Sequence, residues 1–468
     1  MSHHSPSARI VAGAALALSL VLDLAACADA PTRPPRAAPH RPNAALAPAT
    51  VAGPFQLATL GGTYHMALGA NAVGQIAGVS TSNGGSAVVW ETDGTVTPLP
   101  NPAGASASDR ALDINTFGQA AGEVIVAGRA HAALWTPPGM QLTDLNAALG
   151  AVSSTVSAVN DRGQAVGYFQ RADFAPLECF LWTPGAPNGT TGTVTLLGAA
   201  GVPCAASDIN TAGQVTGQYD RHAFLWTPGA PNATDGAMAD LTPADFEGYG
   251  TGLNDAGQVT GYRIGNITPT TAFVWTPPSC GAAAGSITDL GSFLGFPTAA
   301  DDINDAGYVV GYARDENSGR DRAFFWQDGT FTELPGVAGA FTTSPSAVTS
   351  TNLVVGISLL TASSTDRAAL RWQVTPALGT LAQSEIEALQ TLVTSLRGGG
   401  VLDAGLARSL HAKLDAALRQ LRHPCSPAPA NLLAAFANEV SAMVAAGRLT
   451  GSEAQPLLDG AVRAIASL

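Results

Sequence analysis

A single pattern recurs along most of this chain and restricts its fold more than any other feature. Six asparagines are each followed by a glycine three residues later and another seven residues later. They are Asn71, Asn115, Asn160, Asn210, Asn254 and Asn304. A seventh copy at Thr349 keeps only the second glycine, Gly356, and has Asn352 in place of the first. The copies start 44 to 50 residues apart, so the chain is a tandem array of one structural unit.

Each copy also contains one of the chain's seven tryptophans: Trp90, Trp135, Trp182, Trp226, Trp275, Trp326 and Trp372. The fourth copy illustrates the expected unit. Residues 207–210 alternate polar and apolar side chains, as a half-buried strand does, and residues 211–213 form a turn that suits glycine and asparagine. Three further strands are expected at 215–219, 223–226 and 238–241.

A unit of four short strands with one tryptophan is typical of a β-propeller blade. A single blade cannot bury both of its faces, so blades must stack in a ring, and seven close one comfortably. A fourth-strand sequence follows six of the tryptophans, and a similar stretch, residues 54–62, precedes the first asparagine. We therefore expect this N-terminal strand to complete the last blade. Residues 373–378, QVTPAL, are the competing candidate. The prediction is an all-β, seven-bladed β-propeller over residues 54–375.

The hydrophobic period changes near residue 381. Ile386, Leu389 and Val393 follow helical spacing, and three glycines at 398–400 end that helix. Similar spacing predicts helices at about 402–421, 428–446 and 452–467. Residues 381–468 are therefore expected to form a small all-α bundle.

The N-terminus is expected to be an export signal. One arginine precedes an apolar run from Ile10 to Leu22, which suits a signal-peptide core but is too short to span a bilayer. The run ends in Leu-Ala-Ala-Cys27, which resembles the lipobox of bacterial lipoproteins, and this resemblance implies lipidation of Cys27. Residues 1–26 would then be the signal peptide, and the Pro- and Ala-rich residues 27–53 a tether. Ordinary cleavage near Ala28, giving a freely secreted protein, is the alternative.

The net charge of −13 is concentrated in the repeats, where residues 54–380 carry 11 basic and 26 acidic side chains. This balance argues against nucleic acid and against an anionic membrane surface as partners. The expected membrane contact is the N-terminal lipid alone.

The repeated positions do not form a recognisable catalytic or metal-binding motif. The position four residues before each tryptophan varies from histidine at 131 and 222 to glutamate, threonine, arginine and alanine elsewhere, a range that a catalytic or metal-binding role would not tolerate. The triplet Asp-Ile-Asn at 113–115, 208–210 and 302–304 resembles the start of an EF-hand loop, but lacks its later ligands. We interpret the asparagines as turn caps. The common nucleophile, zinc and phosphate motifs are missing, so we expect no metal, cofactor or catalytic residue.

Charged side chains gather in the loops that join the second strand to the third. In a propeller these loops share one face, opposite the Asn-x-x-Gly turns, and loops on a rigid scaffold are the usual place for recognition. The candidate ligand-facing residues are Arg171, Asp173, Glu178, Asp220, Arg221, Arg263, Arg314, Asp315, Glu316, Arg320, Asp321 and Arg322, with Asp366 and Arg367 in the last copy. That these charges only keep the surface soluble is an equally good interpretation.

Four cysteines remain besides Cys27, in a setting where disulfides persist. Cys179 begins a third strand and Cys204 lies in a nearby loop of the same face, so this pair is preferred. A bond between Cys280 and Cys425 would join the two domains. Unpaired buried thiols are the alternative.

The repeats resemble a known bacterial family. The sequences Ile-Asn-x-x-Gly-Gln-Val-x-Gly and His222-Ala-Phe-Leu-Trp226 are similar to the HAF-type probable extracellular repeat, over about residues 54–375. Residues 435–465 resemble the FIMAH-type C-terminal module of secreted bacterial proteins. The resemblances imply a surface protein engaged in attachment or interaction, with no established reaction.

The expected function is therefore that of an exported, lipid-anchored binding or scaffold protein of the cell envelope, whose partner is an envelope protein or glycan. We expect the anchor and the helical domain on the turn side of the ring, with the charged loops facing outward. The alternatives are a propeller hydrolase or lyase acting on an extracellular glycan or peptide, which carboxylates converging at the ring centre would favour, and a purely structural surface-layer component.

Overall fold

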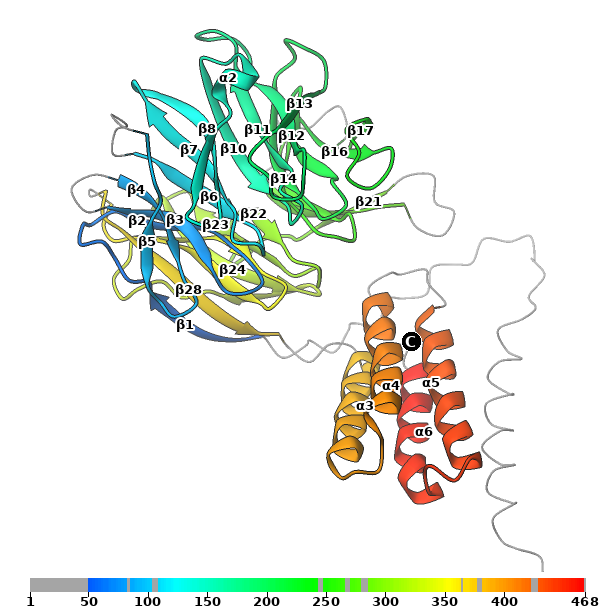
Figure 1. The fold of residues 1–468 in the computed structure, drawn as a ribbon. Coiled ribbons are helices and arrows are strands. Elements are labelled where there is room, and N and C mark those ends of the chain that lie inside the picture. The colour runs from blue at the N-terminus through cyan, green and yellow to red at the C-terminus, as the bar shows by residue number, and fades with distance from the viewer. Residues whose placement is uncertain are drawn as a thin grey trace, which may run out of the picture. The chain divides into compact units, whose positions relative to one another are not determined.

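A computed structural model of the chain describes residues 49–81, 85–102, 108–242, 247–265, 270–278, 285–362, 365–376, 381–421 and 428–466. These residues form seven four-stranded antiparallel sheets followed by four long helices. The sheets follow one another in chain order around a ring (Figure 1). The prediction of a seven-bladed β-propeller with a C-terminal helical domain is confirmed. The proposed signal peptide, Cys27, Cys280 and Cys425 lie outside the described residues.

The blades are numbered from the first repeat, and their strands run from the inner strand outward. Blades one to three consist of β2 (His65–Ala70), β3 (Ile76–Thr81), β4 (Gly85–Trp90) and β5 (Val96–Pro98); β6 (Arg110–Ile114), β7 (Ala120–Val126), β8 (Arg129–Thr136) and β9 (Gln141–Asp144); and β10 (Ser153–Val159), β11 (Ala165–Gln170), β12 (Glu178–Pro184) and β13 (Gly192–Leu197). A short helix, α2 (Asn146–Leu149), follows β9.

Blades four to six consist of β14 (Cys204–Ile209), β15 (Val215–Tyr219), β16 (His222–Pro228) and β17 (Gly236–Asp240); β18 (Glu247–Leu253), β19 (Val259–Ile264), β20 (Thr271–Thr276) and β21 (Ser286–Asp289); and β22 (Thr298–Ile303), β23 (Val309–Asp315), β24 (Arg320–Gln327) and β25 (Thr330–Glu333). Blade seven contains β26 (Thr342–Val348), β27 (Leu353–Leu359) and β28 (Arg367–Thr375), and β1 (Thr50–Gln56) is its outer strand.

The N-terminal strand closes the ring, as the sequence predicts. β1 pairs antiparallel with β28, from Thr50 opposite Thr375 to Gln56 opposite Leu370. The strand begins at Thr50, four residues before the expected start of the propeller. The competing residues Gln373–Thr375 continue β28, the third strand of the blade, so they do not form the fourth.

The two glycine positions of the repeat favour glycine for different structural reasons. The first occupies the left-handed region, with φ of 80° at Gly213, and Asn352 takes its place in blade seven with φ of 59°. Asparagine tolerates this conformation better than most other residues. The second lies in close contact with the backbone of the inner strand. A Cβ on Gly217 would lie only 2.1 Å from the carbonyl oxygen of Ala205. No side chain fits there without moving backbone.

The tryptophans pack between neighbouring blades. Trp90, Trp135 and Trp372 are almost fully buried, and each indole N–H donates to a carbonyl oxygen in the segment that precedes its own inner strand. For example, Trp372 donates to Pro335 at 2.9 Å. These three tryptophans therefore contribute both apolar area and a hydrogen bond to a connecting loop.

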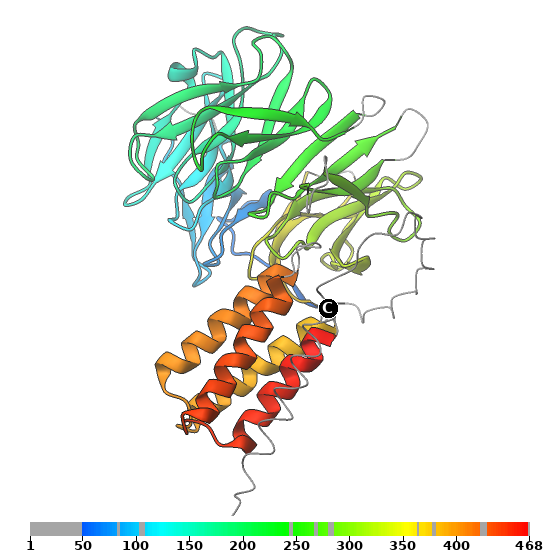
Figure 2. The same cartoon turned by 90° about the vertical axis from the view of Figure 1, so that its right-hand side faces the viewer.

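The C-terminal helices are α3 (Leu381–Gly398), α4 (Ala404–Leu421), α5 (Ala428–Ala445) and α6 (Gly451–Ala466). α3 packs against α4 and α6, and α5 does the same, so the four lie side by side in a bundle (Figure 2). Leu389, Leu410, Phe436 and Leu457 are among its fully buried core residues. Among the described helices, none combines the length and apolarity that crossing a membrane requires.

Substitution of the second repeat glycine tests this packing. We expect Gly217→Ala to lower the free energy of unfolding by about 1–3 kcal/mol, because the new methyl group must displace the backbone of β14. Urea denaturation followed by tryptophan fluorescence measures the change. Gly185→Ala is the matched control, since its Cβ would meet its nearest atom at 3.6 Å. An equal effect of both substitutions would contradict the prediction.

Candidate functional site

The repeat asparagines surround the centre of the ring. The last residues of the inner strands enclose a cavity of about 210 Å³ on the face that carries the Asn-x-x-Gly turns, here called the turn face. Its wall includes the six asparagines and Thr349, which form the Asn ring: Asn71, Asn115, Asn160, Asn210, Asn254, Asn304 and Thr349. All seven are buried.

Each asparagine of this ring joins its blade to the next. The side-chain amide of Asn71 donates to the backbone carbonyl of Asn115 at 2.8 Å, and that of Asn115 donates to Asn160 at 2.9 Å. The same bond repeats around the ring, ending with Asn304 and Thr349 at 3.0 Å. The sequence alone does not indicate this role, because the partner is 44 to 50 residues away.

The asparagine oxygen has the capping role expected from the sequence. Asn210 Oδ1 accepts the backbone N–H groups of Ala212 and Gln214, at 3.1 and 2.9 Å. The oxygens at 115, 160, 254 and 304 accept equivalent bonds within their own turns. One side chain therefore shapes the turn and holds the adjacent blade.

The junction between blades seven and one is built differently. Thr349 has no side-chain amide to continue the Asn ring, and its hydroxyl contacts Thr351 and the N–H of Leu353 instead. Here the chain itself connects the blades, because β1 pairs with β28 in blade seven and is followed by β2 of blade one. The guanidinium of Arg367 in blade seven also donates to Met66 Sδ in blade one, at 3.1 Å. The sheet of blade seven, built from both ends of the propeller, thus closes the ring where the repeated hydrogen bond stops.

Three aspartates of the Asp-Ile-Asn triplets make a second set of bonds between blades. Asp113, Asp208 and Asp302 belong to blades two, four and six. Their Oδ2 atoms accept the N–H groups of Val159, Leu253 and Val348, each on the following inner strand, at 2.7 to 2.8 Å. All three are partly buried, and Asp113 lines the central cavity.

The intervening blades have small residues at this position: Gly69, Ala158, Gly252 and Ala347. A Cβ on Gly252 would lie 2.8 Å from Asp302 Oδ1, and a Cβ on Gly69 would lie 2.7 Å from Asp113 Cα. Asp113 and Asp302 therefore occupy the space that the glycine of the preceding blade leaves free, whereas Asp208 follows a blade with Ala158 at this position.

The electrostatics of these aspartates are unusual. Burial, and next the charge of Asp113, raise the pKa of Asp208 to about 7. Burial also raises the pKa of Asp113. Burial raises the pKa of Asp302 well above its usual value, and the charge of Asp208 is the second cause of that increase. Carboxylates therefore do converge towards the ring centre, as the hydrolase alternative requires, but each one hydrogen-bonds to backbone of the neighbouring blade.

The opposite face, here called the charged-loop face, contains the candidate ligand-facing residues. Several are paired within one hairpin: Arg171 with Glu178 at 2.9 Å, and Arg314 with Asp321 at 3.2 Å. In the last of these hairpins, Asp315 accepts the Asn317 N–H and the Ser318 hydroxyl.

Other charges on this face pair across blades or with outer strands. Asp173 pairs with Arg129 of blade two at 2.6 Å, and Arg221 pairs with Glu247 of blade five. Arg263 pairs with Asp289, and Arg322 with Glu333 at 2.5 Å. The sequence alone does not indicate the partners Arg129, Glu247, Asp289 and Glu333. The remaining candidates are Asp220, whose N–H donates to the Pro203 carbonyl, exposed Glu316, and Arg320, which lies over the Phe341 ring.

The residue four positions before the tryptophan differs between blades, but in several of them it has the same structural role. His131 Nδ1 lies 2.8 Å from Asp144 Oδ2 on the outer strand of its blade, and His222 lies 2.6 Å from Asp240 in the same way. Arg322 and Glu333 are the equivalent pair in blade six.

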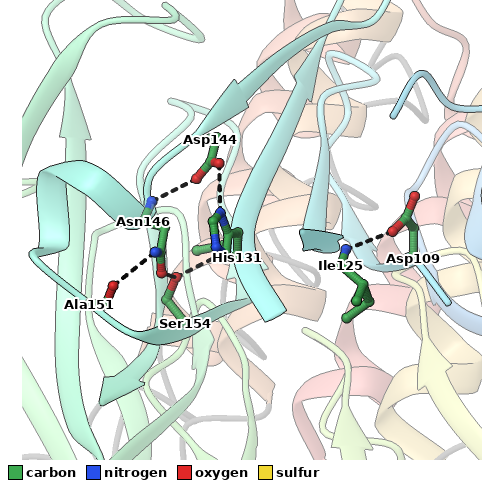
Figure 3. Close-up of polar contacts among 8 residues, drawn as sticks. Asp109, Ile125, His131, Asp144, Asn146, Ala151 and Ser154 are labelled. Carbon is green, nitrogen blue, oxygen red and sulfur yellow. Dashed lines mark hydrogen bonds and ion pairs between the residues drawn. The ribbon is translucent and has the colours of Figure 1, made fainter. Parts of the chain in front are cut away.

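Figure 3 shows the surroundings of His131. Asp144 also accepts the Asn146 N–H, and Ser154 donates its hydroxyl to Asn146 Oδ1 at 2.7 Å. In the same view Asp109 accepts the N–H of Ile125. The serine hydroxyl is thus directed to an amide oxygen, and the network holds α2 against the blade.

A disulfide joins Cys179 to Cys204, with their Cα atoms 5.1 Å apart. This is the pair that the sequence analysis prefers. It links β12 of blade three to the start of β14 in blade four, next to the loops of the charged-loop face.

Removal of one Asn-ring side chain should weaken the propeller. We expect Asn210→Ala to reduce the free energy of unfolding by about 1–3 kcal/mol, because it leaves the buried Asn254 carbonyl and the turn N–H groups without their partner. Chemical denaturation measures this. Asn317→Ala, at an exposed hairpin tip, is the control, and an Asn210 variant as stable as that control would refute the role.

The raised pKa of Asp208 should appear in the pH dependence of stability. Its folded pKa of about 7 exceeds the unfolded value of about 3.9. Stability from the protonated carboxyl is therefore complete below pH ~4 and is lost as the pH rises through ~7. We expect Asp208→Asn to remove this part of the decline in denaturation experiments between pH 4 and 8. Asp328→Asn, on an exposed turn, should leave the profile unchanged, and identical profiles for wild type and Asp208→Asn would disprove the assignment.

No family model matches the chain, and no curated protein matches it. Solved structures that resemble it include a catalytically inactive virginiamycin B lyase from Staphylococcus aureus with quinupristin, at 11% identity and a TM-score of 0.46, covering 70% of this chain and 100% of that one. The β-propeller domain of the Trilobed protease from Pyrococcus furiosus gives 10% identity and 0.44, covering 68% and 98%. The chain's own strand topology makes it a seven-bladed β-propeller followed by C-terminal helices.

Proposed function

We propose that this protein is an exported, lipid-anchored β-propeller that binds an envelope protein or glycan through its charged-loop face without catalysing a reaction. The observation that carries the proposal is the set of ion pairs on that face. Pairs such as Arg171–Glu178 and Arg129–Asp173 hold charged side chains on strands and hairpins of a closed ring. A pattern of fixed charges gives specificity, and side chains that are already ordered lose less entropy on binding.

The chain's two connections to the propeller also support this use of the surface. Thr50, where β1 begins, pairs with Thr375, where β28 ends, and the N–H of Val374 donates to Asn352 in the turn of blade seven. Both connections therefore leave from the turn face. A chain that continues from either end therefore starts on the side opposite the charged-loop face.

Export and anchoring rest on the N-terminal sequence and on the disulfide. The Cys179–Cys204 bond suits an oxidising compartment, and Leu-Ala-Ala-Cys27 resembles a lipobox. The resemblance to HAF-type extracellular repeats and to a FIMAH-type module is consistent with attachment at the bacterial surface.

A crosslinking pull-down from solubilised envelope tests the binding function. The bait is the chain with Cys27→Ser and without the signal peptide, and we expect it to capture a partner. A variant carrying Arg171→Gln, Arg221→Gln and Arg314→Gln should lose most of that capture, because three charge pairs of the face are broken. Arg162→Gln, on an exposed turn of the opposite face, is the control. Equal capture by all three baits would contradict binding through the charged-loop face, and capture of the protein itself alone would favour a structural surface-layer component.

The carboxylates near the ring centre favour a second candidate, a hydrolase or lyase acting on an extracellular glycan or peptide. A carboxyl with a pKa near 7 beside a second carboxyl is a common arrangement for acid–base catalysis. The bonds of Asp113, Asp208 and Asp302 to the next blade weigh against it. Turnover of envelope glycans or peptides that is abolished by Asp208→Asn, in a variant that remains folded, would establish this candidate instead.

A further inference from the structure

A second cavity lies on the charged-loop face, between blades six and seven. Its volume is about 190 Å³, and its wall is formed by the start of β24, the connection at residues 334–341 and the start of β26. This is smaller than the roughly 300–1,000 Å³ of pockets that hold drug-sized ligands. The space suits a single small residue of a larger molecule.

The charges in the wall are mostly neutralised in pairs. Arg322 pairs with Glu333 at 2.5 Å, and Asp321 pairs with Arg314 at 3.2 Å. An ionised carboxylate has lone pairs for about four hydrogen bonds. Asp321 and Glu333 each retain acceptor capacity after binding their arginine, so they can also receive hydroxyl groups.

Arg320 differs from the other charged residues of the wall. Its guanidinium lies over the Phe341 ring, 5.4 Å from the centroid, and both residues line the cavity. Within the part of the chain that the structure describes, no carboxylate lies at ion-pair distance from it. Asp315, its cross-strand neighbour, accepts bonds from Asn317 and Ser318. The Ser318 hydroxyl is the largest cause of the lowered pKa of Asp315, and the charge of Arg320 contributes to it from beyond ion-pair distance. A guanidinium fixed on an aromatic ring presents its N–H groups to a planar anion.

We propose that this cavity binds an acidic sugar, with Arg320 holding the sugar carboxylate and with Asp321 and Glu333 accepting its hydroxyl groups. The proposal rests on the binding function proposed above and names the ligand class at one place on the charged-loop face. A sugar acid combines one carboxylate with several hydroxyls, which matches one unpaired guanidinium beside two carboxylates with spare acceptor capacity.

Calorimetric titration of the full chain carrying Cys27→Ser tests the assignment, with D-glucuronate, D-glucose and N-acetyl-D-alanine as probes. We expect glucuronate to bind at least tenfold more tightly than glucose, which differs from it by the carboxylate. Arg320→Gln should weaken glucuronate binding at least tenfold. Arg320→Lys, which keeps the charge but loses the planar fork, should give an intermediate loss.

Arg129→Gln is the matched control, because Arg129 is an arginine of the same face that already has a carboxylate partner. It should change glucuronate affinity less than twofold, and the Tm of each variant checks that it is folded. Failure of the wild type to bind glucuronate, equal binding of glucose, or an unchanged affinity in a folded Arg320→Gln variant would overturn the inference. Tighter, Arg320-dependent binding of N-acetyl-D-alanine would replace the acidic sugar by a peptide carboxylate.

The result is separable from the proposed function. If the protein captures a partner through the charged-loop face but does not bind glucuronate, the proposed binding function is supported and the acidic sugar is rejected as a ligand. Arg320-dependent glucuronate binding without any captured protein would support the cavity and direct attention to envelope glycans.

Discussion

The hydrogen bond from each repeat asparagine to the backbone of the next blade organises this molecule. The bond lies at the ends of the inner strands, around the centre of the ring. The buried backbone carbonyls of the ring asparagines need hydrogen-bond partners there. One amide donates to the adjacent blade while its oxygen shapes the turn of its own blade. Turn geometry and blade spacing are therefore coupled, and asparagine recurs in six of the seven repeats.

This constraint divides the two faces of the propeller. The turn face is occupied by bonds that hold the ring together, including those of Asp113, Asp208 and Asp302. Among the described residues of the charged-loop face, most contacts differ from blade to blade, and the loops differ in length and charge. Variation is tolerated there because the ring is already closed beneath it. Recognition is therefore proposed for the charged-loop face, whereas Asp113, Asp208 and Asp302 bond one blade to the next.

The repeat pattern was sufficient to predict the number of blades, the strands of each blade and the N-terminal strand that completes the last one. It also indicated the Cys179–Cys204 pair, because both cysteines follow from the strand assignment. The partners of the charged loops were not predictable. Arg129 and Asp173 are 44 residues apart and meet only because blades two and three are adjacent. Asp208 was recognised as part of a triplet, but its bond to Leu253 depends on how far one inner strand lies from the next.

The sequence by itself determined what is local and periodic: four strands per unit, turns that need glycine or asparagine, and helices after residue 381. These follow from short-range preferences and hydrophobic spacing, which the order of residues contains. The tertiary structure decided what requires two blades at once: the Asn ring, the alternation of Asp113 with small residues, and the cavity where Arg320 lies over Phe341. Such contacts depend on the distance and angle between sheets, and closure of the whole ring sets those values.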